Sequence, residues 1–416
     1  MTPMLIALWI ATLGADRLDL AGGAAPFGVL PFYPLTAALV WLEWLRRRRA
    51  GALPRPSPAQ WRFLALLLGL LSLAAVSVFR SGDVPLSVSR LILLGGITLG
   101  SALALWLMSD RDDRTLLLAR GAQWGLALAL LADGLQLAQF VGALPEEVTL
   151  GPLRLLLGAH SYGIFPRLTG LSYDINGAGG TILVQAALIW LAGPSLPYRR
   201  AWLALAGVLV ALTLSRSTAL AALPAVLLLP RVDVLGRGAR LALAAGSLAF
   251  AAGTAALLHE PLRAATARAL APLAERFDPS EASAQSHAHL MLRGLDEATR
   301  DVPRTLLGAG YGSSHRLLQD IFPGLKHGNF HTVYLQLWVE SGVFALLTYL
   351  AILFATWRRA GALRGLVIGF VLYGITYQGM VQPALWILIA LVWATELQRR
   401  VRSVDAGVTV NGAIPA

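Results

Sequence analysis

Long apolar runs alternate with short polar segments along almost the whole chain. About 20 apolar residues in helical form cross a bilayer. The pattern predicts helices at residues 4–22, 27–45, 61–79, 88–108, 115–143, 178–194, 200–214, 217–230, 239–258, 331–357, 363–377 and 381–398. It therefore indicates an all-α, polytopic membrane protein with about twelve transmembrane helices.

Two polar segments are much longer than the others, residues 144–177 and 259–330. The second has a basic amphipathic start, a predicted helix from His287 to Thr299 and a glycine-rich turn, Leu307–Gly312. Long loops with helices of their own are commonly functional. The pattern divides the chain into membrane helices at 1–143, 178–258 and 331–398, loops at 144–177 and 259–330, and a tail at 399–416.

The arginines predict an orientation. With twelve spans, one side of the membrane receives Arg46–Arg49, Arg111 and Arg114, Arg199 and Arg200, Arg231, Arg358 and Arg359, and Arg399 and Arg400. Cytoplasmic loops carry such an excess of basic residues. We therefore expect both termini in the cytoplasm and both long segments on the outer face.

Composition agrees with a membrane protein, because 56% of residues are hydrophobic and only 14% are charged, with a mean hydropathy of +0.64. The net charge of +11 comes almost wholly from arginine, and Lys326 is the only lysine. In this context the charge indicates cytoplasmic loops and an anionic ligand, not nucleic acid. The absence of cysteine excludes disulfides, a thiol nucleophile and cysteine-based metal sites.

Arginines on the expected outer side are candidates for phosphate binding, since a guanidinium can hold phosphate through two hydrogen bonds. Arg216 interrupts two apolar runs, which favours a function. For Arg80 and Arg90, ion pairing or snorkelling to headgroups is favoured. The segment Asp110-Arg-Asp-Asp-Arg114 alternates acids with arginines, so we interpret it as a self-neutralised surface loop and not a Mg²⁺ site.

His331 lies where the second long segment returns to an apolar helix, shortly after Lys326 and His327. If that helix begins at His331, Tyr334 lies one turn on and on the same face. A titratable side chain at the mouth of a membrane helix is costly unless it has a task. The alternative is an interfacial histidine that only caps the helix and snorkels.

Three motifs in order resemble the O-antigen ligase and O-antigen polymerase superfamily of bacterial inner membranes. They are Arg167-Leu-Thr-Gly170 with Asp174-Ile-Asn176, then Leu214-Ser-Arg-Ser217, then Leu307-Gly-Ala-Gly310 followed by His331, Tyr334-Leu-Gln336 and Glu340-Ser-Gly342. Ile175 stands where the family has proline, and Thr332 where it has asparagine. The similarity covers roughly the C-terminal 60% of the chain, and its motifs run from Arg167 to the helix predicted at 331–357.

The resemblance implies a GT-C-like enzyme that transfers a glycan from undecaprenyl diphosphate at the periplasmic face, inverting, metal-independent and without a cofactor. It implies that His331 is catalytic and that Arg167 and Arg216 bind the diphosphate. Where the family has an arginine in the large outer loop, this chain reads Ser286-His-Ala-His-Leu-Met-Leu-Arg293. The resemblance therefore implies that Arg293 or one of the histidines supplies the positive charge of the family's arginine. Accessory candidates are His289, Lys326, Tyr334 and Asn176. His331 could act as a general base, orient the acceptor or bind phosphate.

The favoured expectation is an O-antigen ligase with lipid A–core oligosaccharide as acceptor, working among membrane lipids and without nucleic acid. The single dominant outer loop just before His331 favours it. An O-antigen polymerase, which joins lipid-linked repeat units, shares fold and donor and stays open, as does a protein O-glycan transferase. A secondary transporter predicts an internal repeat and ion pairs at the membrane midplane, and the sequence shows neither.

Overall fold

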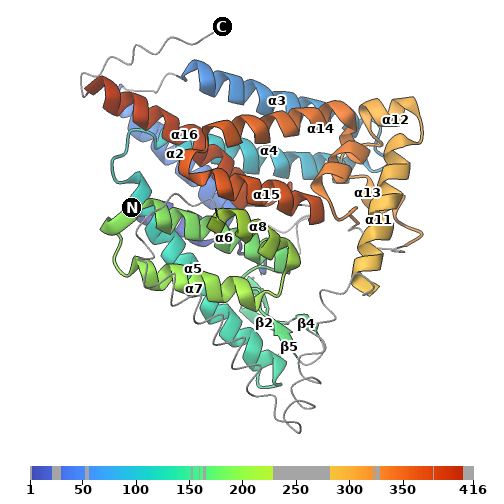
Figure 1. The fold of residues 1–416 in the computed structure, drawn as a ribbon, viewed down its shortest axis with the longest axis horizontal. Coiled ribbons are helices and arrows are strands. Elements are labelled where there is room, and N and C mark those ends of the chain that lie inside the picture. Colours follow the sequence, from blue (N-terminus) through green and yellow to red (C-terminus); the bar gives the residue numbers. More distant parts are fainter. Residues whose placement is uncertain are drawn as a thin grey trace.

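The computed structural model describes residues 2–20, 30–51, 56–150, 153–158, 160–162, 165–227, 282–321, 323, 328–377 and 379–405. This part of the chain is mostly helical (Figure 1). Its α-helices are α1 (Thr2–Ala11), α2 (Phe32–Arg49), α3 (Pro58–Val78), α4 (Val84–Leu107), α5 (Arg114–Phe140), α6 (Ile175–Leu191), α7 (Arg199–Leu212), α8 (Arg216–Leu227), α11 (Ala282–Thr299), α12 (Val302–Leu307), α13 (Ser314–Leu317), α14 (Val333–Arg359), α15 (Arg364–Thr376) and α16 (Pro383–Asp405). Short 3₁₀ turns, Gly193–Ser195 and Gly361–Leu363, follow α6 and α14.

Four of the described helices are long and apolar enough to cross a membrane: α3, α4, α5 and α14. Shorter apolar helices, among them α1, α6 and part of α16, pack with them around one large apolar core. Trp9 of α1 and Trp386 of α16 are fully buried in this core. These lengths and compositions confirm a helical protein of the membrane type.

Most helices begin and end within a few residues of the predicted bounds, but the first does not. It was predicted over 4–22, whereas α1 ends at Ala11. Asp16 and Arg17 are the reason, because Arg17 turns back to the segment before α6, donating from its backbone N–H to Leu171 O (3.0 Å) and from Nε to Ser172 O (2.7 Å). The helix predicted at 239–258 lies outside the described residues.

Short strands lie in and beside the loop predicted at 144–177, within a protein that is otherwise mostly helical. The strands are β1 (Leu18–Asp19), β2 (Glu147–Leu150), β3 (Leu153–Leu156), β4 (His160–Tyr162) and β5 (Phe165–Arg167). β3 pairs antiparallel with both β2 and β1, so that Leu155 lies opposite Val148 and Leu18. β4 and β5 form a second antiparallel pair. Alternating polar residues and a short turn favour hairpins here, and Arg167 ends the last strand.

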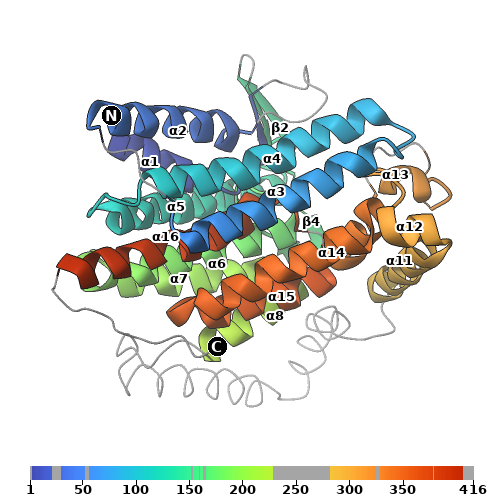
Figure 2. The same cartoon turned by 90° about the horizontal axis from the view of Figure 1, so that it is seen from above.

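The helices α11, α12 and α13 gather at the end of the bundle where α3 and α4 meet (Figure 2). α11 contains the predicted helix His287–Thr299 and begins at Ala282. It packs against α14 through a small apolar cluster of Leu290, Ala298, Leu318, Phe330 and Val339. Gly294 of α11 approaches the ring of Phe330 so closely that a Cβ there would lie 3.0 Å from it. This contact places α11 beside the residue before His331.

The glycine-rich turn docks into a break in α14. Gly342 has φ 83° and ψ 172°, which interrupts the helical geometry. The carbonyls freed by the break accept backbone N–H groups of the turn, from Ala309 to Val339 O (2.7 Å) and from Gly310 to Glu340 O (3.0 Å). A Cβ on Gly342 would lie 2.1 Å from Leu306 O, so only glycine fits. The interpretation of the run as a tight turn is confirmed.

Candidate functional site

His331 occupies a strained position just before α14. Its backbone φ is 55°, a left-handed conformation that residues other than glycine seldom adopt. Its neighbours hold it there: Thr332 Oγ1 donates to Gly374 O (3.0 Å), and the Val333 N–H donates to Tyr377 O (3.2 Å). The His331 N–H donates to Asn329 Oδ1 (2.9 Å). Strain of this kind persists only where the surroundings impose it, and it concentrates at functional sites.

Helix α14 begins at Val333 and not at His331, which overturns one predicted relation. His331 and Tyr334 do not share a helix face, because His331 has left-handed geometry and Thr332 is extended. The Tyr334 hydroxyl donates to Val371 O (2.7 Å), and its ring lies 6.2 Å from that of Tyr349. These contacts give Tyr334 a packing role between α14 and α15.

Arg216 is the first residue of α8. The preceding Ser215 caps the helix, since its Oγ accepts the Thr218 N–H (3.1 Å). The same Oγ donates to Asn176 Oδ1 (2.6 Å), which ties α8 to the first turn of α6. Ser217 lies on the other side of Arg216, and its Oγ is 2.9 Å from Thr376 Oγ1 of α15. Arg216 thus stands between two anchored serines.

Arg167 shapes the loop that leads to Arg216. Its Nε donates to Thr213 O (3.3 Å) and its Nη2 to Leu214 O (3.2 Å), both carbonyls at the end of α7. The Leu168 N–H donates to Leu212 O (3.2 Å) beside them. Only 8% of Arg167 is exposed. These hydrogen bonds assign Arg167 a positioning task, and direct contact with a substrate phosphate stays a prediction.

Asn176 fastens α6 to the same junction. Asp174 caps α6 by accepting the Gly177 N–H (2.8 Å). The Tyr373 hydroxyl of α15 donates to Asn176 O (2.6 Å), and Gln382 Nε2 donates to Gly177 O (2.6 Å). The structure therefore places the accessory candidate Asn176 directly beside the Ser-Arg motif.

The N-termini of α6, α8 and α14 thus meet around Tyr373–Tyr377 at the C-terminal end of α15. Each helix N-terminus carries a partial positive charge that favours anions. Arg216 adds a full positive charge, and His331 adds a titratable nitrogen. We call this junction the candidate site. Its chemistry suits a negatively charged ligand beside a group that can accept a proton.

Asp16 is a residue of this region that the sequence analysis missed. Burial raises the pKa of its carboxyl to about 7, opposed by hydrogen bonds from the Tyr173 N–H and from Ser172 Oγ (3.1 Å) and increased by the nearby Asp174. Burial also raises the pKa of the Tyr377 hydroxyl well above its ordinary value, with Asp174 adding to the effect. The signal was available, because Asp16-Arg17 interrupts an apolar run as Arg216 does.

The candidate residues that the structure describes in the segment 259–330 are not part of the candidate site. His289 and Arg293 both lie on α11, four residues apart as predicted, and His289 is exposed. Arg293 Nη2 lies 3.6 Å from both Glu297 and Asp320, so carboxylates share its charge. Lys326 and His327 lie outside the described residues. Residues on α11 reach the candidate site only indirectly, through the packing of Gly294 on Phe330.

Arg80 and Arg90 serve the glycine turn. Arg80 Nε donates to Gly308 O (2.8 Å), and Arg90 Nη1 donates to Gly312 O (2.7 Å). The sequence favours a structural role for both, and in the structure both donate to main-chain carbonyls of the turn. The loop at Asp110 behaves as interpreted, since Asp110 pairs with Arg46 (2.7 Å) and Arg47 (2.9 Å) and Asp113 with Arg111 (3.1 Å).

No protein-family model and no curated protein matches the chain. The resemblance to the ligase and polymerase superfamily therefore depends on the motifs themselves. What the structure contributes is their spatial relation: residues from the first two motifs and from the start of the third contact one end of α15.

Proposed function

We propose that this protein is an O-antigen ligase-like glycosyltransferase. It moves a polysaccharide from undecaprenyl diphosphate to a hydroxyl of lipid A–core oligosaccharide. The observation that supports it most strongly is the junction of Arg216 and His331. Ser217 and Thr332, their immediate neighbours, bond to Thr376 and Gly374, two residues apart on α15.

The reaction breaks a glycosidic C–O bond to a diphosphate. The acceptor oxygen attacks the anomeric carbon from the opposite face, and the bonding electron pair leaves with the diphosphate oxygen. Arg216 and the N-terminus of α8 stabilise the charge that grows on that oxygen. Arg167 supports this arrangement by fixing the loop before Arg216. This assignment explains why a cation opens a helix inside apolar sequence.

The acceptor hydroxyl must lose a proton during the attack. Neutral imidazole has an ordinary pKa of about 6.5, which suits a base at neutral pH. His331 is half-buried, and its left-handed backbone holds its side chain at the mouth of α14. We assign the proton-accepting role to His331. We also propose that the transfer is inverting and needs no metal ion.

The proposed setting is the bacterial inner membrane, with twelve spans, cytoplasmic termini and a periplasmic site. The described helices are consistent with it. α2 and α14 carry Arg46–Arg49 and Arg358–Arg359 in their last turns, and α6, α8 and α14 begin at the candidate site. In this orientation the arginine-rich ends of α2 and α14 face the cytoplasm.

A deletion strain analysed by lipopolysaccharide gel electrophoresis tests the proposal. A ligase leaves bare core, while long glycans accumulate on undecaprenyl diphosphate. Core that carries a single repeat unit would instead identify a polymerase and overturn the assignment as a ligase. Unchanged lipopolysaccharide and unchanged lipid-linked glycan would overturn the proposal as a whole.

A further inference from the structure

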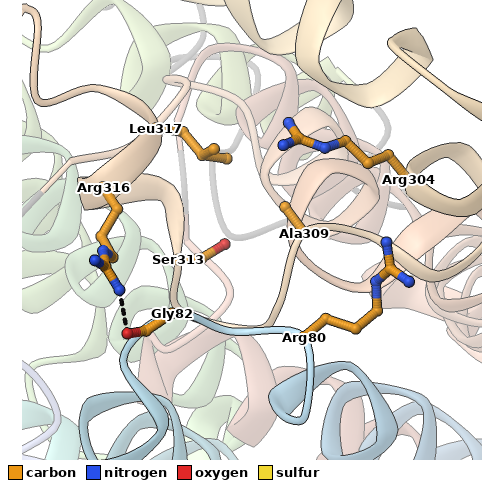
Figure 3. A pocket seen from close by; sticks show the side chains of 7 residues that line it. All are labelled: Arg80, Gly82, Arg304, Ala309, Ser313, Arg316 and Leu317. Carbon is orange, nitrogen blue, oxygen red and sulfur yellow. Dashed lines mark hydrogen bonds between the residues drawn. The ribbon is translucent and has the colours of Figure 1, made fainter.

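A cationic cavity lies away from the candidate site, between the turn that joins α3 to α4 and the segment α12–α13. Figure 3 shows the side chains that line it. Its volume is about 460 Å³. Three of its lining residues are arginines, Arg80, Arg304 and Arg316, and no acidic residue is among the described residues that line it. Cavities of this size commonly hold small-molecule ligands.

Two of these arginines form no ion pair with an acidic residue in the part of the chain that the structure describes. Arg80 is anchored to Gly308 O through Nε, and Arg316 is anchored to Gly82 O through Nη1 (Figure 3 shows the second bond). A carbonyl fixes a guanidinium without neutralising it, and each guanidinium has five N–H donors. Arg304 differs, because Glu297 and Asp301 pair with it. The cavity is thus lined by oriented donors and a net positive charge.

Ser313 provides an independent observation. It lines the same cavity, is only 4% exposed, and its Oγ has no hydrogen-bond partner within the described part of the chain. A buried hydroxyl without a partner is costly, because it has lost its hydrogen bonds to water. Ser313 precedes α13, yet its side chain makes no capping hydrogen bond there. The hydroxyl is available to a ligand that enters between the arginines.

We propose that this cavity binds a phosphate monoester carried by a sugar. The phosphate oxygens accept hydrogen bonds from Arg80, Arg316 and Ser313 Oγ, because guanidinium groups and hydroxyls match phosphate geometry. The volume exceeds what a phosphate alone fills, which leaves room for the sugar. None of the lining residues belongs to the candidate site, so the proposal stands or falls separately from the proposed reaction.

Substitutions at Ser313 test the proposal. In Ser313→Asp the carboxylate occupies the position of the phosphate among the arginines. Asparagine has nearly the same size as aspartate but no charge, so Ser313→Asn is the matched control. Binding of glucose 6-phosphate to the full chain in phosphatidylcholine nanodiscs is measured by titration calorimetry at low salt. We expect Ser313→Asp to raise the dissociation constant by about tenfold or more, the size of one charge-assisted bond, and Ser313→Asn to bind nearly as well as the wild type.

A parallel measurement identifies the source of the phosphate. Thermal unfolding is compared in nanodiscs with and without phosphatidic acid. If glucose 6-phosphate does not bind but phosphatidic acid raises the melting temperature of the wild type and not of Ser313→Asp, the anion site is supported and its ligand is a lipid headgroup. Equal binding by wild type and Ser313→Asp overturns the proposal. The proposal is also overturned if the wild type neither binds glucose 6-phosphate nor is stabilised by phosphatidic acid. The same holds if Ser313→Asp and Ser313→Asn lose binding equally.

Discussion

The two ends of α4 treat arginine in opposite ways. At its C-terminal end, Arg46, Arg47 and Arg111 pair with carboxylates; Glu43 is fully buried and bonds Arg46 (2.7 Å) and Arg111 (3.0 Å). At its N-terminal end, Arg80 and Arg316 donate to main-chain carbonyls. The first arrangement neutralises charge, whereas the second fixes it in place and preserves it.

The kind of partner distinguishes an arginine with a structural role from one that can bind a ligand. The number of arginines in a region does not make this distinction as well. A carboxylate partner removes the attraction of an arginine for an external anion. A carbonyl partner orients the guanidinium while leaving its charge to act on a ligand. Arg167 also donates to main-chain carbonyls, those of Thr213 and Leu214. We therefore expect substitutions at the neutralised end to affect stability, and substitutions at the candidate site to affect transfer.

The largest effect is expected at His331. His331→Asn removes the imidazole, but asparagine tolerates a left-handed backbone, so the protein should fold. We expect glycan transfer by the purified protein to fall about 10²–10⁴-fold, the usual contribution of a general base. Arg216→Ala should lose activity similarly, whereas Arg364→Ala, at the other end of α15, should not. Full activity in His331→Asn would remove the catalytic assignment.

At the opposite end of α4, the expected loss is in stability. Glu43→Gln leaves Arg46 and Arg111 without their buried carboxylate. Removing the charge of a buried, hydrogen-bonded carboxylate costs about 1–3 kcal/mol, and thermal unfolding in nanodiscs would show a lower melting temperature. Asp113→Asn is the exposed control, for which about 0–1 kcal/mol is expected. Equal melting temperatures in the two variants would contradict the contrast between the buried and exposed carboxylates.

A smaller effect is expected from Asp16 and depends on pH. Burial raises its pKa from 3.8 to about 7 in the folded protein, so the folded state binds more protons than the unfolded state between these values. Stability from this group is present at low pH and lost as pH rises through about 7. Asp16→Asn should therefore melt on the order of 2 °C above the wild type at pH 8 and show no advantage at pH 4. The exposed control Asp112→Asn should follow the wild type at both pH values; the same behaviour in Asp16→Asn would disprove the assignment.

Apolar periodicity predicts most of the helices, because a membrane-type helix depends on composition over many residues. The same logic failed at the N-terminus, where Asp16 and Arg17 end the apolar face, and it gave no sign of the strands that pair in 144–177, a segment expected to be a loop. It also misplaced the start of α14 by two residues. Those residues include His331, whose left-handed backbone depends on contacts with α15.

The candidate site was only partly predictable. Arg216 and His331 were identifiable because charged or titratable residues are costly within apolar sequence. Their meeting at α15 was not, since it depends on Thr332, Ser217 and Thr376, residues with no individual signal. The role of Arg167 as a support for the loop after α7 also needed the fold, because Thr213 and Leu214 accept through their main-chain carbonyls.

The break at Gly342 makes the first part of α14 a lever arm. Val333–Ser341 rises about 1.5 Å per residue, so the arm is about 13 Å long. A rotation of about 10° around Gly342 would displace its tip, next to His331, by about 2 Å, a shift of the size that disrupts catalytic alignment. The bonds of Ala309 and Gly310 to the arm resist that rotation from one side. The position of His331 thus depends partly on a turn more than twenty residues earlier in the chain.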